Sequence, residues 1–163
     1  IIDIGGRSTS ISVGIRGTLT YSGQTDFSSD SLTQALASAL NINARRADTM
    51  KRQIQIIGQG GNHELSTIMI PIIDVILNEA KRIRDGFESS YQEKVVGVIL
   101  AGSGANMPGF TEYLAQQIGL PVSTGNALAA CQYPPEIESF AKQLGPTMTV
   151  AIALLITIAA VPL

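Results

Sequence analysis

The sequence predicts an α/β fold, in which strands and helices alternate around one core. Three observations support this class: the first residues alternate in polarity as strands do, the middle of the chain has apolar residues at helical spacing, and short apolar runs bounded by glycine alternate with helical segments toward the end. At 163 residues, 45% of them hydrophobic, the chain is long enough for one substantial core.

The opening segment is typical of a strand meander. Ile11, Val13 and Ile15 fall on one face of an extended chain, and small residues fall on the other. Thr18–Tyr21 follows a turn as another strand, so residues 1–22 are predicted to form three strands.

A helix is expected next, because the spacing of apolar residues changes. Ser28, Ser29 and Asp30 are candidate N-caps. Five residues then recur at helical spacing toward one core: Leu32, Ala35, Leu36, Ala39 and Leu40.

Residues 43–93 are more polar and are predicted to form a mainly helical lobe inserted into the sheet domain. ARRADTMKRQIQII is followed by the break GQGGN and by a long helix over 65–91. Pro71 fits its first turn or marks where the main helix begins. The predicted apolar stripe of this helix is Ile68, Ile72, Val75, Ile76, Ala80 and Ile83.

The rest of the chain alternates between strands and helices. Val95–Leu100 is an apolar run expected to form a central strand covered on both faces. The further expected elements are a helix at 108–118, a short strand from Leu120, a polar helix at 135–144 and an apolar element from Pro146. The ending TMTVAIALLITIAAVPL is shorter than the roughly 20 residues of a membrane span, which favours a buried helix or strand over a membrane segment.

Composition argues against several function classes. A net charge of −2 with 15% charged residues provides no basic field for nucleic acid. One cysteine and one histidine, Cys131 and His63, do not allow an intrachain disulfide or a zinc site of the usual kind. The chain opens with IIDIGG, without a leader, and we expect it to be part of a longer protein.

Two predicted strands end on glycine turns: Asp3–Thr9 and Ala101–Asn106. Glycine lets a ligand approach the backbone, and the exposed amides of such turns favour phosphate. Asp3 would then hold Mg²⁺ through water. The alternatives are an ordinary bend between elements and a turn cap at Asp3. Neither turn has a P-loop or dinucleotide-binding pattern.

These residues resemble the actin-like ATPases. IIDIGGRSTSISV is similar to their second phosphate motif, and VILAGSGANMPGFTEYLAQQIGLPV is similar to their adenosine motif. Ala47–Lys51 is similar to the Ala-Glu-x-x-Lys of their inserted helix, with Asp48 in place of Glu, and Ser103 stands where many relatives have glycine. DIGGRSTSISV, GNALAACQYP and TVAIALLI look most like the type IV pilus assembly family PilM, with the cell-division family FtsA next.

The resemblance implies the C-terminal half of such a protein, with the N-terminal half absent. Residues 1–42 and 94–163 would form a ribonuclease-H-like mixed sheet domain with flanking helices, and residues 43–93 the inserted lobe. ATP with Mg²⁺ would bind between the halves. The implied contacts are Asp3 near Mg²⁺; Gly5, Gly6, Arg7, Ser8 and Thr9 at the phosphates; Asp48 and Lys51 at the nucleoside; and Gly102, Ser103, Gly104 and Asn106 near ribose and adenine.

The resemblance also implies a role in assembly of the pilus inner-membrane complex, in the cytoplasm at the bacterial membrane. The expected partners are a cytoplasmic peptide of an inner-membrane assembly protein and a second copy of the chain. No general base is evident, so we expect slow ATP hydrolysis at most, and only with the missing half. An adaptor with a vestigial cleft is the alternative. The basic group on the inserted helix either steers phosphate or is a solvated face: Arg45, Arg46, Lys51 and Arg52.

Overall fold

The computed structural model describes residues 1–53, 55, 63–126, 128, 132–141 and 144–149. Its strands are β1 (Ile2–Ile4), β2 (Thr9–Ile15), β3 (Thr18–Thr25), β4 (Val98–Ala101) and β5 (Val122–Thr124). Its helices are α1 (Ser29–Ala39), α2 (Ala44–Gln53), α3 (His63–Tyr91) and α4 (Phe110–Ile118), with 3₁₀ turns η1 (Ser103–Asn106) and η3 (Pro135–Ile137). The predicted α/β class is confirmed.

The strands form one mixed sheet in the order β3-β2-β1-β4-β5. The first three strands are the predicted meander and pair antiparallel, with Ile2 opposite Ile11. β4 then adds to the other side of β1 in parallel, with Ile2 opposite Leu100, and β5 adds in parallel to β4. β1 is therefore the central strand, between the meander and the later parallel pair.

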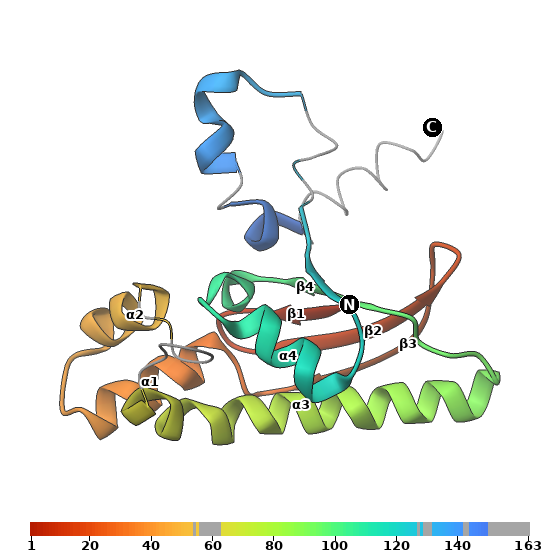
Figure 1. The fold of residues 1–163 in the computed structure, drawn as a ribbon, viewed down its shortest axis with the longest axis horizontal. Coiled ribbons are helices and arrows are strands. Elements are labelled where there is room, and N and C mark those ends of the chain that lie inside the picture. The colour runs from red at the N-terminus through yellow and green to blue at the C-terminus, as the bar shows by residue number, and fades with distance from the viewer. Residues whose placement is uncertain (54, 56–62, 127, 129–131, 142–143, 150–163) are drawn as a thin grey trace.

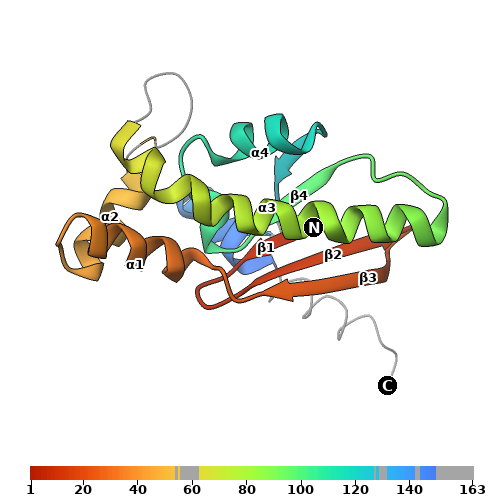
Figure 2. The same cartoon turned by 90° about the horizontal axis from the view of Figure 1, so that it is seen from below.

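Figures 1 and 2 show α3 running along one face of the sheet, with α4 on the same side. Most of the side chains that α3 buries are spaced three or four residues apart, and Ile76 and Leu77 are adjacent. They are Leu65, Met69, Ile73, Ile76, Leu77, Ala80, Ile83 and Phe87. The predicted stripe is thus confirmed at Ile76, Ala80 and Ile83, and Ile68 and Ile72 are partly buried against the same core. It is wrong at Val75, which is exposed.

The predicted place of Pro71 at or near the start of the helix is wrong. Pro71 lies well inside α3, which begins at His63, and not in its first turn. A proline there removes one helical hydrogen bond, from its own position to the carbonyl of Thr67. Both residues are exposed, so water can solvate that carbonyl. The helix continues, and this side of it, Val75 included, faces solvent.

The structure differs from the prediction that this strand, β4, is covered on both of its faces. β4 is internal to the sheet, and Val98 and Leu100 are buried on the face that α3 and α4 cover. Ile99 points to the other face and is 44% exposed. The prediction of a strand covered on both faces is therefore wrong for the part of the chain that the structure describes.

The last described residues lie on the opposite side of the sheet from α3 (Figure 1). The predicted polar helix begins as the η3 turn and continues as helix through 138–141, and residues 144–149 are helical again. Most of the predicted terminal apolar element lies outside the described residues, as do Cys131 and the break at 58–62. Among the helices that are described, none combines the length and the apolar character that a membrane crossing requires.

Candidate functional site

The two glycine turns lie side by side. β1 and β4 are parallel neighbours, with Asp3 opposite Ala101. The carboxyl ends of both strands therefore meet at one edge of the sheet, and the chain leaves each strand into its turn there. Two segments that are far apart in the sequence thus form one candidate site, which is where α/β sheets commonly bind ligands.

Gly102 is where the second turn contacts β1. Its φ of 83° and ψ of 174° belong to a region that only glycine readily occupies. A Cβ added there would overlap the carbonyl oxygen of Ile4 and Oδ1 of Asp3, and one added at Gly104 would overlap the Ile4 side chain. Both glycines therefore allow the second turn to pack directly on β1, because a side chain at either position would overlap that strand.

The first turn is closed by its own backbone. The amide of Gly5 donates to the carbonyl of Ser8 at 3.0 Å. Thr9 is buried, and its hydroxyl donates to the carbonyl of Phe27 at 2.7 Å. Gly6 and Arg7 are exposed and Ser8 is half-buried. Thr9 therefore anchors the turn, while the residues before it can meet a ligand.

Helix α1 starts directly on this turn. Ser28 is its N-cap, as predicted among the candidates, and forms a capping box with Ser31. The amides of Ser29 and Asp30 donate to the carbonyls of Gly5 and Gly6, each at 3.0 Å. The first amides of α1 are thus used to hold the turn in place.

Asp3 supplies a half-buried carboxylate at the meeting point of the two turns. Burial raises the pKa of this carboxyl above its ordinary value. Within the described residues no three acidic, histidine or cysteine groups gather as metal ligands. A single carboxylate beside a glycine turn with exposed residues still fits Mg²⁺, which is commonly held by one or two carboxylates together with substrate phosphates and water.

Lys51 is placed differently from the expectation of a solvated basic face. Its side chain is 2% exposed. The ammonium donates to the carbonyl of Ser29 at 2.9 Å and to the hydroxyls of Ser29 and Thr33, each at 2.7 Å. Burial lowers the pKa of Lys51, and hydrogen bonding to Asp48 opposes that shift. The solvated-face interpretation is therefore wrong for Lys51, whereas Arg45, Arg46 and Arg52 are exposed.

Asp48 lies at the exposed end of the same group, with its side chain 37% exposed. Its Oδ1 is 3.0 Å from the Lys51 ammonium, and its Oδ2 accepts from Nε of Arg52 at 2.8 Å. Burial alone would raise the pKa of Asp48, but the hydrogen bonds from Arg52 and Lys51 outweigh it and hold the pKa below its ordinary value. The carboxylate is thus ionised and fixed in orientation.

Ser29 and Thr33 were not among the predicted site residues. They lie four residues apart on α1, on the side where Leu32 and Leu36 are buried. Buried hydroxyls require hydrogen-bond partners. Two hydroxyl residues at helical spacing within an apolar stripe were therefore the signal in the sequence that could have indicated a polar partner.

The remaining predicted residues divide between buried and accessible positions. Gly104 is buried, Ser103 is half-buried, and Asn106 is exposed at the end of η1. The structure therefore brings Asp3, Gly5, Gly102 and Gly104 together, and connects Lys51 to them through Ser29.

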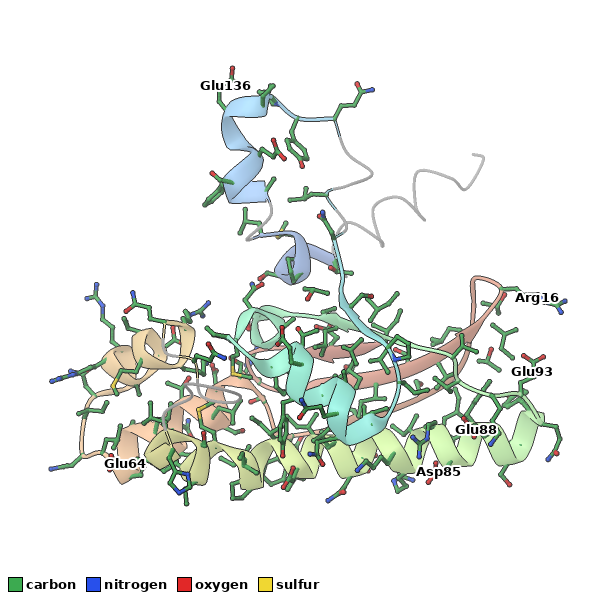
Figure 3. The ribbon with its side chains drawn as sticks, in the orientation of Figure 1. Arg16, Glu64, Asp85, Glu88, Glu93 and Glu136 are labelled. Atoms are coloured by element: carbon green, nitrogen blue, oxygen red, sulfur yellow. The ribbon has the colours of Figure 1, made fainter. Side chains whose placement is uncertain are left out.

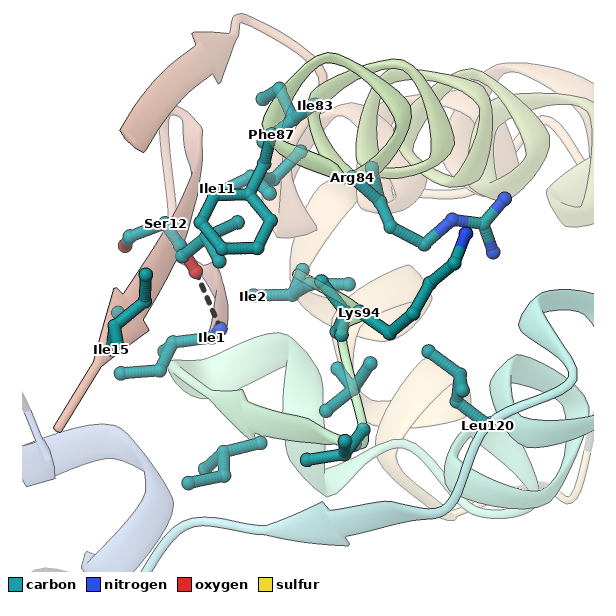
Figure 4. Close-up of a pocket in the computed structure, with 18 of the residues that line it drawn as sticks. Ile1, Ile2, Ile11, Ser12, Ile15, Ile83, Arg84, Phe87, Lys94 and Leu120 are labelled. Carbon is teal, nitrogen blue, oxygen red and sulfur yellow. Dashed lines mark hydrogen bonds between the residues drawn. The ribbon is translucent and has the colours of Figure 1, made fainter. Parts of the chain in front are cut away.

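A separate hollow of about 620 Å³ opens at the other end of the strands. Ile1, Ile11, Phe87 and Val98 give it a mainly apolar lining, with Arg84 and Lys94 on one side (Figure 4). It lies between the β2–β3 hairpin and the end of α3, where Figure 3 shows Arg16, Glu88 and Glu93. The hollow is near the start of β1 and β4, so it is distinct from the glycine turns at their carboxyl ends.

We expect Asp3→Asn to raise the melting temperature of the ligand-free chain at neutral pH. The raised pKa of Asp3 means that the folded chain binds this proton more tightly than the unfolded chain, so ionisation destabilises the fold as pH rises through that pKa. An amide of the same shape avoids this cost, and its benefit should disappear below the ordinary pKa of an aspartate. Thermal unfolding measures the change, with the exposed Asp26→Asn as control. A larger loss of stability in Asp3→Asn than in the control would contradict the prediction.

The sheet order, the flanking helices and the two adjoining turns define an actin-like α/β fold. The structure of a "PilM-PilN type IV pilus biogenesis complex" aligns with a TM-score of 0.80 at 22% identity, covering 96% of this chain and 44% of that one. MreB5 of Spiroplasma citri bound to AMPPNP aligns with a TM-score of 0.65 at 12% identity, covering 97% and 54%. The ethanolamine utilization protein EutJ from Carboxydothermus hydrogenoformans gives 0.64 at 20%, covering 93% and 45%.

The particular family follows from the sequence. Residues 1–157 match the family described as type IV pilus assembly protein PilM, and the chain belongs to that family. No curated protein matches it significantly. The chain spans less than half the length of the PilM and EutJ chains with which it aligns.

Proposed function

We propose that this chain is the nucleotide-binding C-terminal half of a PilM-type protein that acts in assembly of the type IV pilus inner-membrane complex. The observation that carries the proposal is the parallel pairing of β1 with β4, which brings two glycine turns to one edge of the sheet beside the Asp3 carboxylate. The MreB5 structure with the same fold was solved with AMPPNP bound to that protein. ATP with Mg²⁺ is the proposed ligand.

Each part of the site has a proposed role. Asp3 would hold Mg²⁺ through water, and the turn Gly5–Ser8, which Thr9 anchors, would meet the phosphates. Asp48 and Lys51 lie at the part of the site that binds the nucleoside. The ribose and adenine lie near the second turn, at Gly102, Ser103, Gly104 and Asn106. The exposed residues Gly6 and Arg7 of the first turn support this assignment, since the backbone N–H groups of such turns favour phosphate oxygens.

The proposed cleft is completed by another half of a longer chain. Under this proposal residues 1–42 and 94–163 form the ribonuclease-H-like subdomain, and residues 43–93 are the inserted lobe. Binding pockets usually enclose about 70 to 90% of a ligand, and two adjoining turns at a sheet edge cover only one side. We therefore propose nucleotide binding for the complete protein, with slow hydrolysis at most.

The proposed partner is a cytoplasmic peptide of an inner-membrane assembly protein, which keeps the protein at the inner face of the membrane. The aligned pilus protein was solved as a complex of PilM with PilN, which supports a partner of this kind. Nucleotide would close the cleft and change the surface presented to that partner, as in other switches driven by domain closure.

A calorimetric Mg-ATP titration of the complete protein tests the proposal. We expect Asp3→Ala to weaken binding roughly 10- to 100-fold, as is usual when a group that orients a metal is removed. The same substitution at the exposed Asp26 serves as the control. The effect of Asp3→Ala should shrink when Mg²⁺ is omitted, because its proposed contact is with the metal. Equal Mg-ATP affinity for Asp3→Ala and wild type would refute the proposal.

An adaptor with a vestigial cleft is the second candidate. It is favoured by Asp48 in the place of Glu, by Ser103 in the place of glycine, and by the use of the Lys51 ammonium within the fold. Such a protein would bind its partner peptide with the same affinity with and without Mg-ATP. Titration of the peptide under both conditions separates the two candidates.

A further inference from the structure

Lys51 carries a buried charge whose hydrogen-bonding capacity is fully used by the protein. An ammonium has three N–H donors, and four oxygen atoms lie within 3.0 Å of this one. They belong to the Ser29 carbonyl, the Ser29 hydroxyl, the Thr33 hydroxyl and the Asp48 carboxylate. With 2% of the side chain exposed, the group is an internal connection between α1 and α2.

These contacts continue to the first glycine turn. The amide of Ser29 donates to the carbonyl of Gly5 at 3.0 Å, while the carbonyl and hydroxyl of the same residue accept from Lys51. A chain of hydrogen bonds therefore runs from Gly5 through Ser29 and Lys51 to Asp48. It joins the turn proposed for the phosphates to the helix proposed for the nucleoside.

We infer that Lys51 is a positioning residue of the nucleotide site: its buried ammonium ties α2 and the Asp48 carboxylate to Ser29 and the Gly5 turn, and does not itself contact the nucleotide. The inference rests on the proposed function and deepens it. Asp48 is the member of the pair that meets the ligand, and Ser29 and Thr33 support the site by holding Lys51 without contacting the nucleotide.

The alternative, a direct contact by Lys51, requires several bonds to be given up. Moving the ammonium to a ligand would break charge-assisted hydrogen bonds and leave the buried hydroxyls of Ser29 and Thr33 without their cation. Asp48 needs no such change, because it is partly exposed and is already oriented by Lys51 and Arg52. A side chain fixed before binding loses less freedom when the ligand arrives.

Thr33→Val is the decisive variant, because it removes one partner of Lys51 on α1 and leaves Lys51 and Asp48 in place. We expect Mg-ATP binding by the complete protein to weaken roughly three- to ten-fold, the range for residues that share one polar network. Thr33→Ser retains the hydroxyl and should retain the affinity. Thr49→Val is the matched control. The Thr33 hydroxyl donates to the carbonyl of Ser29, four residues earlier, and the Thr49 hydroxyl donates to a carbonyl four residues earlier in the same way, but from an exposed position on α2.

A direct contact predicts the opposite result. Losing the Thr33 hydroxyl would then free the Lys51 ammonium, and affinity would stay equal or increase, which would overturn the inference. A purely structural role would lower the melting temperature of Thr33→Val without changing its Mg-ATP affinity, and this also overturns it. Failure of wild type to bind Mg-ATP removes the proposed function itself, so the two failures are distinguishable.

The coupling between Lys51 and Thr33 in their effects on Mg-ATP affinity gives a second test of the inference. Lys51→Met is expected to bind Mg-ATP more weakly than wild type, and Thr33→Val is expected to add nothing further in the double variant. Independent, additive losses would show that Thr33 does not act through Lys51. Hydrogen exchange of the ligand-free protein provides a readout without nucleotide: amides of α2 should exchange faster in Thr33→Val and remain as in wild type in Thr49→Val.

Discussion

Gly102→Ala is expected to destabilise the chain by about 3 kcal/mol or more. The backbone conformation of Gly102 is strained for any other residue, at about 1–3 kcal/mol. The added Cβ would also overlap the Ile4 carbonyl and the Asp3 carboxylate, and forcing atoms into a packed site costs about 1–3 kcal/mol more. Both neighbours belong to β1, so the substitution would push the second turn away from the first, and the proposed Mg-ATP binding should be lost with it.

Gly17→Ala separates these two causes. Gly17 also has a positive φ, 82°, but a Cβ there would meet no atom within 4 Å. Its loss of stability therefore measures the cost of a positive φ at a position where the added Cβ overlaps no atom. Urea unfolding of both variants gives the comparison, and equal losses would mean that the packing of Gly102 on β1 contributes nothing.

Phe110→Ala should destabilise the chain by about 3–5 kcal/mol, the usual range for removing a buried aromatic side chain. Phe110 begins α4, is 1% exposed and belongs to the main core, in which Met107 and Leu114 are also buried. Its loss opens a cavity under the segment that joins η1 to α4. We therefore expect reduced protection of the η1 amides in hydrogen exchange as well as a lower midpoint in urea.

Phe140→Ala is the matched control for that experiment. Phe140 is 59% exposed, and substitutions at exposed positions usually change stability by less than about 0.5 kcal/mol. A loss at Phe140 as large as that at Phe110 would contradict the assignment of the core to the sheet and its covering helices.

The parts of the fold that the sequence predicts are those determined locally. The strand meander follows from alternation over Ile11, Val13 and Ile15, and the start of α1 follows from the capping pattern at Ser28. The two glycine turns follow from small residues at strand ends. Their meeting at one edge also follows from parallel strands once the class of fold is known.

The burial of Lys51 could not be predicted, because it depends on the packing of two helices. The sequence ARRADTMKRQ has basic residues on several sides and a single fully buried apolar residue, Ala47. Which basic side chain turns inward is decided by the hydroxyls of α1, and these become neighbours only in the folded chain. The place of Pro71 was predicted wrongly for a different reason, since a proline favours a helix start whereas α3 runs through it.

The central position of β1 has a consequence for the order in which the chain folds. Its antiparallel neighbour β2 follows at once in the sequence, whereas its parallel neighbour β4 comes only after three helices. Contacts between distant segments form late, because the loop between them must first be ordered. The edge that brings Asp3 to Gly102 is therefore completed near the end of folding, and a ligand held there would bind only the finished chain and draw the equilibrium toward it.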